Sequence, residues 1–310
     1  MAATVLGIIA PLFGLILLGY LTRKRGWMPA GSTPALNAYV VWLAIPAMFF
    51  RIMAESELRT FWQPGFLLAF GAGTATVFAL AYLVARRGGH GRGAAGIDAL
   101  IASYPNTGYM GIPLCIAAFG DTGLQAALIA CVIPVTIVFM GAIMLLEFDR
   151  RAGHGLGAAL RQTARQLGTN PLILAPLAGI AWNVTGLSIP GPVRELLMLL
   201  GASATPCALV NIGLFLAETA TGGGHGRVGW LLGLKLVVQP AITALVALSL
   251  HMPPVWASAA ILLTALPTGT GPFMLATHYR LDSALPARTI LLSTIVSTLT
   301  VTAVLMLFMP

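Results

Sequence analysis

Long apolar segments recur along the whole of this 310-residue chain, with short polar connectors between them. About 20 apolar residues in a helix are enough to cross the hydrocarbon core of a bilayer. Hydrophobic residues make up 58% of the chain and charged residues 8%, whereas about 25% of the residues of an average soluble domain are charged. The chain lacks the strict apolar and polar alternation of barrel strands, so we expect an all-α integral membrane protein.

We expect about ten transmembrane helices. The first is read as a retained helix and not as a signal peptide, because the basic cluster Arg23, Lys24 and Arg25 follows the apolar run instead of preceding it. The ten segments cover approximately residues 3–21, 34–53, 64–85, 97–119, 124–147, 170–188, 193–217, 228–250, 254–277 and 284–309.

Basic residues are distributed unequally between alternate connectors. With the amino terminus outside, the outer connectors hold Arg51, Arg59 and Arg194. The inner connectors hold twelve basic residues: Arg23, Lys24, Arg25, Arg86, Arg87, Arg92, Arg150, Arg151, Arg161, Arg165, Arg227 and Arg280. The positive-inside rule therefore predicts a multi-pass protein of the bacterial inner membrane with both termini in the periplasm. It also explains the net charge of +8 without a nucleic-acid partner.

The two halves of the chain share local features at an offset near 160 residues. Ile45-Pro46-Ala47 corresponds to Thr205-Pro206-Cys207, and Tyr104-Pro105-Asn106 corresponds to Leu266-Pro267-Thr268. We predict a first five-helix repeat over 1–149, a cytosolic linker over 150–169 and a second repeat over 170–310. An odd number of helices per half makes the second repeat inverted within one membrane domain.

The fourth and ninth segments carry the residues that disturb a helix most. Ser103-Tyr-Pro-Asn-Thr-Gly-Tyr-Met-Gly-Ile-Pro113 contains two prolines and two glycines, and Pro267-Thr-Gly-Thr-Gly-Pro272 repeats the pattern. Proline removes an amide donor, and glycine lowers the cost of irregular backbone. Two interrupted helices at equivalent positions of two repeats indicate a binding site, although prolines that merely kink packed helices are the alternative.

The residues around these interruptions suit an anion. Amino termini of half-helices carry partial positive charge and unpaired amides, which favour a carboxylate. The candidate substrate-binding residues are Pro105, Asn106, Thr107, Pro267, Thr268 and Thr270. Lys235, inside the eighth segment, is a candidate charge partner, or else it snorkels to the cytosolic surface.

Other chemistry receives little support from the sequence. Cys115, Cys131 and Cys207 lie in apolar segments and are expected to be free thiols, and the five histidines show no metal-ligand spacing. Asp98 and Glu147 stand near the cytosolic ends of their segments, which argues against a central carboxylate site for sodium or protons. No nucleotide loop and no nucleophile with its base is apparent. We therefore expect no cofactor, no metal and no enzymatic activity.

Several short motifs together resemble the auxin efflux carrier family over essentially the whole chain. They are Gly19-Tyr-Leu-Thr-Arg-Lys-Arg-Gly26, Leu43-Ala-Ile-Pro-Ala47, Asn106-Thr-Gly-Tyr-Met-Gly-Ile-Pro113, Lys235-Leu-Val-Val-Gln-Pro240 and Ala265-Leu-Pro267. The family includes bacterial proteins described as malonate and malate permeases. The resemblance implies a scaffold of helices one, two, six and seven and a transport unit of helices three to five and eight to ten.

By the same resemblance, helices four and nine would cross at Pro105 and Pro267, where Asn106 would help to bind a carboxylate. The transport unit would move like an elevator, and the scaffold would form a homodimer within membrane lipid. Plant auxin carriers have an acidic residue in helix three near the crossing, whereas this chain has Gly71-Ala-Gly-Thr-Ala-Thr76. The plant carriers also have a longer central loop, so auxin is not the default substrate.

The expected function is secondary transport of a small organic anion, such as an auxin-like monocarboxylate, malonate or malate, driven by the membrane potential or by protons. A sodium-coupled carrier of the bile-acid type is the alternative within transport. A membrane receptor or scaffold that binds without turnover is the alternative outside transport.

Overall fold

The computed structural model describes residues 2–133, 137–150, 168–169, 171–218 and 225–308. In this part of the chain the secondary structure is helical, and the one extended pairing is an isolated bridge. The chain divides into two compact units. The smaller unit comprises Pro11–Trp62 and Ala164–Glu218, and the larger comprises Met1–Ala10, Gln63–Thr163 and Thr219–Pro310. The smaller unit contains expected helices two, six and seven and the second half of expected helix one, whose first residues fall in the larger unit.

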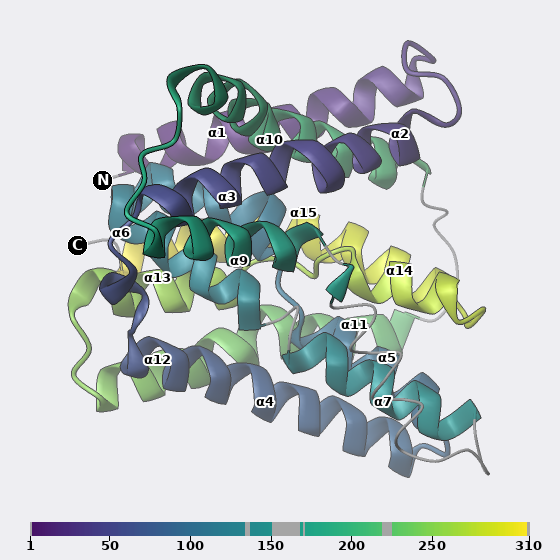
Figure 1. Ribbon diagram of the computed structural model, residues 1–310. Coiled ribbons are helices and arrows are strands. Elements are labelled where there is room, and N and C mark those ends of the chain that lie inside the picture. The colour runs from purple at the N-terminus through teal and green to yellow at the C-terminus, as the bar shows by residue number, and fades with distance from the viewer. Residues whose placement is uncertain (1, 134–136, 151–167, 170, 219–224, 309–310) are drawn as a thin grey trace. The chain divides into compact units, whose positions relative to one another are not determined.

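The smaller unit is held together by close helix packing. α3 runs beside α9 (Figure 1) and also packs against α10. Gly179 permits the α3–α9 contact, because a Cβ at this position would lie 2.5 Å from the Phe50 carbonyl oxygen. The helices of the unit are α1 (Ala2–Lys24, which begins in the larger unit), α2 (Ser32–Tyr39), the π-helix η1 (Val40–Ala44), α3 (Ile45–Glu55), α9 (Pro171–Val184) and α10 (Gly191–Glu218).

The larger unit has an apolar core to which Val77, Leu100 and Ile143 contribute. α4 and α12 run side by side (Figure 1), and α5 packs between neighbours that include α4 and α7. The helices of the unit are α4 (Pro64–Arg87), α5 (Arg92–Ser103), the π-helix η3 (Thr107–Gly111), α6 (Ile112–Ile133), α7 (Phe139–Arg150), α11 (His225–Gly233), the π-helix η5 (Leu234–Val238), α12 (Gln239–Ser249), α13 (Pro254–Thr264), α14 (Gly271–His278) and α15 (Ala284–Phe308).

The structure contains a multi-pass set of membrane helices. In the described residues, seven helical segments are long and apolar enough to span a bilayer: Val5–Lys24, Ser32–Glu55, Pro64–Arg87, Thr107–Cys131, Gly191–Glu218, Gly226–Ser249 and Ala284–Phe308. Leu174–Val184 and Pro254–Thr264 are apolar but shorter. Six of these segments correspond to the first, second, third, seventh, eighth and tenth expected spans, whereas Thr107–Cys131 covers the end of the fourth and the start of the fifth. The sixth and ninth expected spans contain the two shorter helices. The count of ten remains a prediction.

The chain breaks between the fourth and fifth expected helices at Gly120. α6 (Ile112–Ile133) consists of two helical parts joined at this residue, whose backbone is non-helical at φ 60° and ψ −139°. A positive φ of this kind is readily available only to glycine. A Cβ at Gly123 would lie 2.1 Å from the Cys115 carbonyl oxygen, so the chain turns back on itself here, within the connector expected at 120–123. The linker predicted over 150–169 lies almost wholly outside the described residues.

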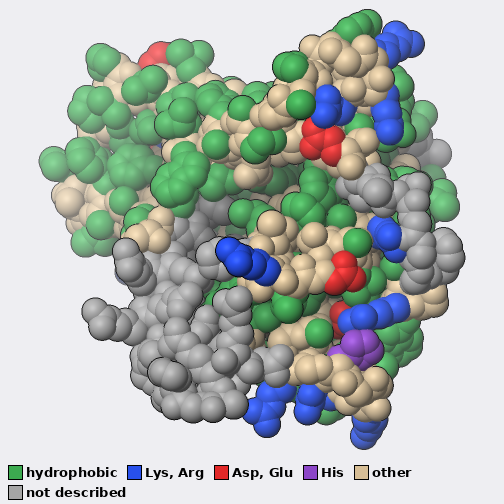
Figure 2. Space-filling model, turned by 90° about the vertical axis from the view of Figure 1, so that its right-hand side faces the viewer, with side chains coloured by type: hydrophobic (Ala, Val, Ile, Leu, Met, Phe, Trp, Pro, Cys, Tyr) green, Lys and Arg blue, Asp and Glu red, His purple; other side chains and the backbone are tan. Residues whose placement is uncertain are grey.

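Basic side chains mark one end of the larger unit. α4 ends with Arg86 and Arg87, where cations interact favourably with the carboxyl end of a helix, and α5 begins at Arg92. All three residues are exposed. Figure 2, which views the side of Figure 1 on which α4 ends, shows Lys and Arg side chains at the surface around apolar patches. This clustering is the pattern used above to assign the cytosolic side.

Candidate functional site

Two helical segments of the larger unit stop and restart close to one another. α5 ends at Ser103, residues 104–106 are not helical, and η3 begins at Thr107. α13 ends at Thr264, and α14 begins only at Gly271. Both non-helical stretches contain one of the prolines singled out in the sequence, Pro105 and Pro267. Each proline lacks the amide that a continuous helix would use.

The two non-helical stretches pair with each other. Pro105 and Thr268 form an isolated antiparallel bridge. The Asn106 amide donates a 2.8 Å hydrogen bond to the Pro267 carbonyl, and the Gly269 amide donates one of 2.9 Å to the Tyr104 carbonyl. Backbone groups in a membrane interior must find partners within the protein. The pairing supplies those partners, so each interruption stabilises the other.

Thr268 is anchored on both sides by the structure. Its amide donates a 3.1 Å hydrogen bond to the Ser293 hydroxyl oxygen of α15, and its own hydroxyl donates one of 3.0 Å to the Ile101 carbonyl of α5. The residue is fully buried. The Thr268 side chain therefore has a positioning role in this structure, and its hydroxyl proton is not available to a ligand.

Asn106 differs from Thr268 in that its side-chain amide is uncommitted. The side chain is 6% exposed, and no hydrogen bond joins it to another described residue. Its backbone is fully used, because the Asn106 carbonyl also accepts from the amides of Met110 at 3.2 Å and Gly111 at 3.0 Å. The Asn106 side-chain amide is therefore a candidate group for binding a polar solute beside the pairing.

The remaining predicted residues lie around this pairing. Thr107 is buried, and its amide donates a 2.8 Å hydrogen bond to the Pro105 carbonyl. Thr270 is half-buried directly before α14.

Tyr104 was not predicted as part of this region from the sequence. A Cβ on Gly271 would lie 2.9 Å from the Tyr104 ring. The two glycines, Gly269 and Gly271, were the only sequence feature that could have indicated a large ring packed against this segment.

Lys235 reaches toward the interrupted segment from η5. It is completely buried, and its Nζ donates a 2.6 Å hydrogen bond to the Thr264 carbonyl, the last residue of α13. This finding removes the alternative in which Lys235 snorkels to the surface. The carboxyl end of a helix carries partial negative charge, so a cation or donor is favourable there.

Gln239, one helical turn after Lys235, was not among the predicted site residues. Its Nε2 donates to the Ser103 carbonyl at 3.2 Å and to the Thr74 hydroxyl at 3.1 Å. Its Oε1 is buried and has no hydrogen-bond partner among the described residues. Ser103 is the last residue of α5. Lys235 therefore donates to the last carbonyl of α13, and Gln239 donates to the last carbonyl of α5. The i, i+4 spacing was visible in the sequence, but the partners were not.

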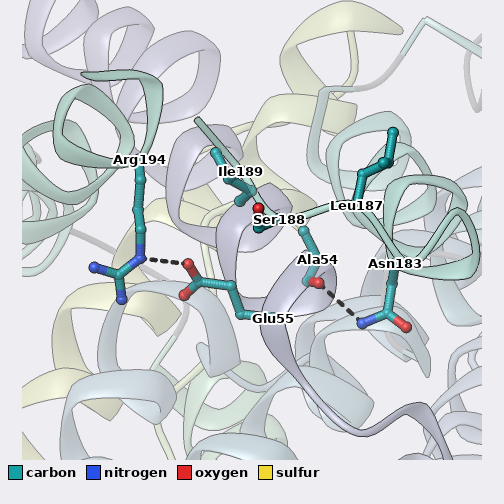
Figure 3. Close-up of a pocket in the computed structure, with 8 residues that line it drawn as sticks. Ala54, Glu55, Asn183, Leu187, Ser188, Ile189 and Arg194 are labelled. Carbon is teal, nitrogen blue, oxygen red and sulfur yellow. Dashed lines mark hydrogen bonds and ion pairs between the residues drawn. The ribbon is translucent and has the colours of Figure 1, made fainter. Parts of the chain in front are cut away.

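A separate surface hollow of about 430 Å³ lies on the smaller unit (Figure 3). Arg194 pairs with Glu55 at 2.7 Å, and Asn183 Nδ2 donates to the carbonyls of Met53, Ala54 and Ser56 at 3.2, 2.9 and 2.8 Å. The bonds from Asn183 provide partners for backbone carbonyls at the carboxyl end of α3. Glu55, Asn183 and Arg194 are thus committed to structure, and none of the predicted site residues lines the hollow.

The predicted thiols and acids occupy structural positions. Cys115 and Cys131 are buried free cysteines, and Cys207 is free with intermediate exposure. Asp98, which was expected near a cytosolic helix end, is 4% exposed. Both of its oxygens accept from Arg227 of α11, at 2.9 and 2.7 Å. The pairing commits this carboxylate to linking α5 with α11.

Comparison with known proteins extends over nearly the whole chain. The family described as "Membrane transport protein" matches residues 4–305. A protein of Rhizobium meliloti (strain 1021) named "Putative malonate transporter" is 32% identical over 98% of this chain and 96% of its own length. An uncharacterized transporter of Methanothermobacter thermautotrophicus is 26% identical over 91% of both chains. Auxin efflux carrier component 8 of Arabidopsis thaliana is 26% identical over 87% of this chain and 88% of its own length.

Proposed function

The chain belongs to the membrane transport protein family, which includes the auxin efflux carriers, and from this premise we propose that it moves a small organic anion across the bilayer as a secondary transporter. The relatives named above are transporters, in agreement with the expectation that the chain is not an enzyme. The observation that carries the proposal is the pairing of residues 104–106 with residues 267–269. This pairing uses the Asn106 backbone, while the side-chain amide of Asn106 has no hydrogen bond to another described residue.

The charge around the pairing favours an anion over a cation. Lys235 approaches one side of the interrupted segments, and Asp98, the acid on α5, is already paired with Arg227. Asn106 can donate two hydrogen bonds to a carboxylate. Hydrogen bonds to a charged group contribute about 1.5–3 kcal/mol, more than bonds between neutral groups. A carboxylate at Asn106 would thus be held by both the amide and the nearby positive charge.

The proposed architecture is ten spans in two inverted five-helix repeats. The fourth span would be α5 with η3 and the first part of α6, and the ninth would be α13 with α14. Their interruptions meet at the Pro105–Thr268 bridge, in support of crossing helices. The larger unit would move as an elevator against the smaller one, which would form a homodimer. Both termini would face the periplasm.

A short dicarboxylate is the proposed substrate class. The name of the Rhizobium meliloti relative gives malonate, and this relative aligns with nearly all of the chain. Helix α4 offers Gly73 and Thr74 where plant auxin carriers are expected to have an acid, which makes auxin the weaker choice. Outward movement of one negative charge gains about 2.3 kcal/mol per 100 mV when the interior is negative. The membrane potential alone could therefore drive export, whereas uptake needs a coupled ion.

The proposal is tested by ligand stabilisation and exchange with purified protein. Malonate should raise the apparent melting temperature, because a ligand that binds only the folded state stabilises it. It should also support counterflow in proteoliposomes, which a receptor would not. The Asn106→Ala variant should bind malonate about tenfold or more weakly, because a hydrogen bond to a charged group is lost.

Asn106→Asp is the matched control for the sign of the ligand charge. It keeps the shape of the side chain and adds a negative charge, so it should weaken malonate binding beyond Asn106→Ala. Stronger binding of a cationic solute by Asn106→Asp, without a response of the wild-type protein to carboxylates, would contradict the anion site. Uptake that requires sodium would favour the sodium-coupled alternative.

A further inference from the structure

Lys235 is a fully buried basic residue, and its one hydrogen bond within the described residues goes to a neutral group. Its exposed fraction is 0%, and its Nζ donates to the Thr264 carbonyl at 2.6 Å. Burial of an ammonium group is expensive unless a negative charge neutralises it. The carbonyl at the end of α13 offers only a partial negative charge. The ammonium form of Lys235 therefore gains when an anion arrives nearby.

The elements packed around η5 contain one acid in the described residues. Five of these elements contact η5 directly, and α13 contributes Thr264. α12 and α13 have no ionisable side chain. The ionisable residues on the other four are Tyr82, Arg86 and Arg87 of α4, Arg92 and Asp98 of α5, His225 and Arg227 of α11, and Arg288 of α15.

Asp98 is a poor counter-charge for Lys235, because Arg227 occupies both of its oxygens. Arg227 also precedes Lys235 by eight residues, which is about 12 Å along a helix. No acid on the described parts of these elements is therefore left to neutralise an ammonium group at Lys235, and a buried charge without a counter-charge is costly.

The position of Lys235 connects it with the proposed anion site. Thr264 precedes Pro267 by three residues, and Pro267 accepts the Asn106 amide. Gln239, on the same face one turn later, binds the Ser103 carbonyl two residues before Pro105. Lys235 of η5 and Gln239 of α12 thus contact the ends of the two interrupted helices. An anion beside Asn106 would lie near this face and supply the missing negative charge.

We propose that Lys235 is the proton acceptor that couples anion transport to a proton gradient. The inference rests on the proposed function. The neutral amine takes one proton from the aqueous phase on the side from which the anion enters, and a new N–H bond forms. The ammonium form and the anion cross together, and the same proton is released to the opposite aqueous phase when the anion leaves. For a dianion such as malonate, each cycle moves one net negative charge.

The test uses purified full-length protein in proteoliposomes with radiolabelled malonate and a clamped membrane potential. An inward proton gradient of about one pH unit should drive about tenfold accumulation by the wild-type protein, because one proton per anion transfers that gradient to the substrate. Lys235→Met should exchange malonate more weakly, because the charge partner of the anion is lost, and it should not accumulate malonate above equilibrium. Lys235→Arg, which stays charged, should exchange malonate without accumulation and with little pH dependence.

Gln239→Leu is the control for a purely structural role. It removes the analogous hydrogen bond to the end of α5 but no titratable group. This variant should transport more slowly and still reach the tenfold ratio. Thermal unfolding of each variant reports whether it is folded, and Lys235→Arg keeps the question open to test if Lys235→Met does not fold.

The outcomes separate this inference from the proposed function. Accumulation that survives in Lys235→Met would overturn the inference, because the substrate would then carry the proton. Exchange by the wild-type protein without any accumulation in a proton gradient would overturn the inference alone. Absence of malonate exchange by the wild-type protein would overturn both.

Discussion

The closest helix approach of the smaller unit gives a prediction whose magnitude follows from the structure. α1 and α10 meet at two glycines. A Cβ added at Gly19 would lie 2.1 Å from the Val210 carbonyl oxygen, and one added at Gly213 would lie 2.0 Å from the Ile16 carbonyl oxygen. Small residues at such crossings allow helix backbones to approach in a membrane, where packing drives association. Replacement of Gly19 by alanine must therefore separate the helices.

The cost can be estimated from the required displacement. Ordinary contact begins near 3.4 Å, so the backbone has to move by 3.4 − 2.1, or 1.3 Å, at this point. Overpacking of a well-packed contact costs about 1–3 kcal/mol. The Arg23–Glu218 ion pair, which joins the same helices at 2.7 Å, is partly exposed and adds little. Gly19→Ala should lose about 1–3 kcal/mol relative to a helical Gly→Ala change without a clash.

Gly14 of α1 provides that reference, because nothing lies within 4 Å of a Cβ at this position. Both substitutions change helix propensity alike, so the difference between Gly14→Ala and Gly19→Ala isolates the clash. Thermal unfolding in detergent should show a lower melting temperature for Gly19→Ala by several degrees, at about 2–4 °C per kcal/mol. Equal stability of the two variants would refute the close packing of α1 on α10.

Two further variants test the larger unit. Pro267→Ala should allow a more regular ninth span and slow malonate exchange more than it lowers the melting temperature, since the Asn106–Pro267 pairing depends on the interruption; full exchange by a well-folded variant would count against this reasoning. Arg227→Met should destabilise the protein more than Asp98→Asn, because Asp98 is 4% exposed and would be left as a buried, unpaired carboxylate. Equal losses in thermal unfolding would contradict that assignment.

The part of the site that could be predicted from the sequence is the part with local chemistry. Pro105 and Pro267 each predict a helix interruption, because proline lacks an amide donor. The offset of about 160 residues between similar motifs in the two halves indicates that the two positions are equivalent. The structure brings these two positions together through the Pro105–Thr268 bridge. Apolar length and charge asymmetry likewise predicted a multi-pass membrane protein, because both follow from the cost of polar groups in lipid.

The contacts that could not be predicted join residues far apart in the chain. The Thr268 hydroxyl was expected to face a ligand, yet it donates to Ile101, 167 residues away. Asp98 pairs with Arg227 across 129 residues, and Lys235 bonds with Thr264 across 29. A residue type shows which bonds are possible, but tertiary packing selects the partner. Gln239 was overlooked for this reason, because a glutamine in an apolar helix has no preferred partner in the sequence.

Three prolines within helical spans are each preceded by a π-helix instead of a break in the helix. η1, η3 and η5 each end two residues before a proline, namely Pro46, Pro113 and Pro240. In each case the amide before the proline bonds five residues back, as Gln239 does to Leu234. A π turn widens the helix locally and relieves the clash between proline and the preceding turn. In η5 the widened turn carries Lys235 and is followed directly by Gln239. Pro240 therefore helps to set the angle at which these two side chains reach the ends of α13 and α5.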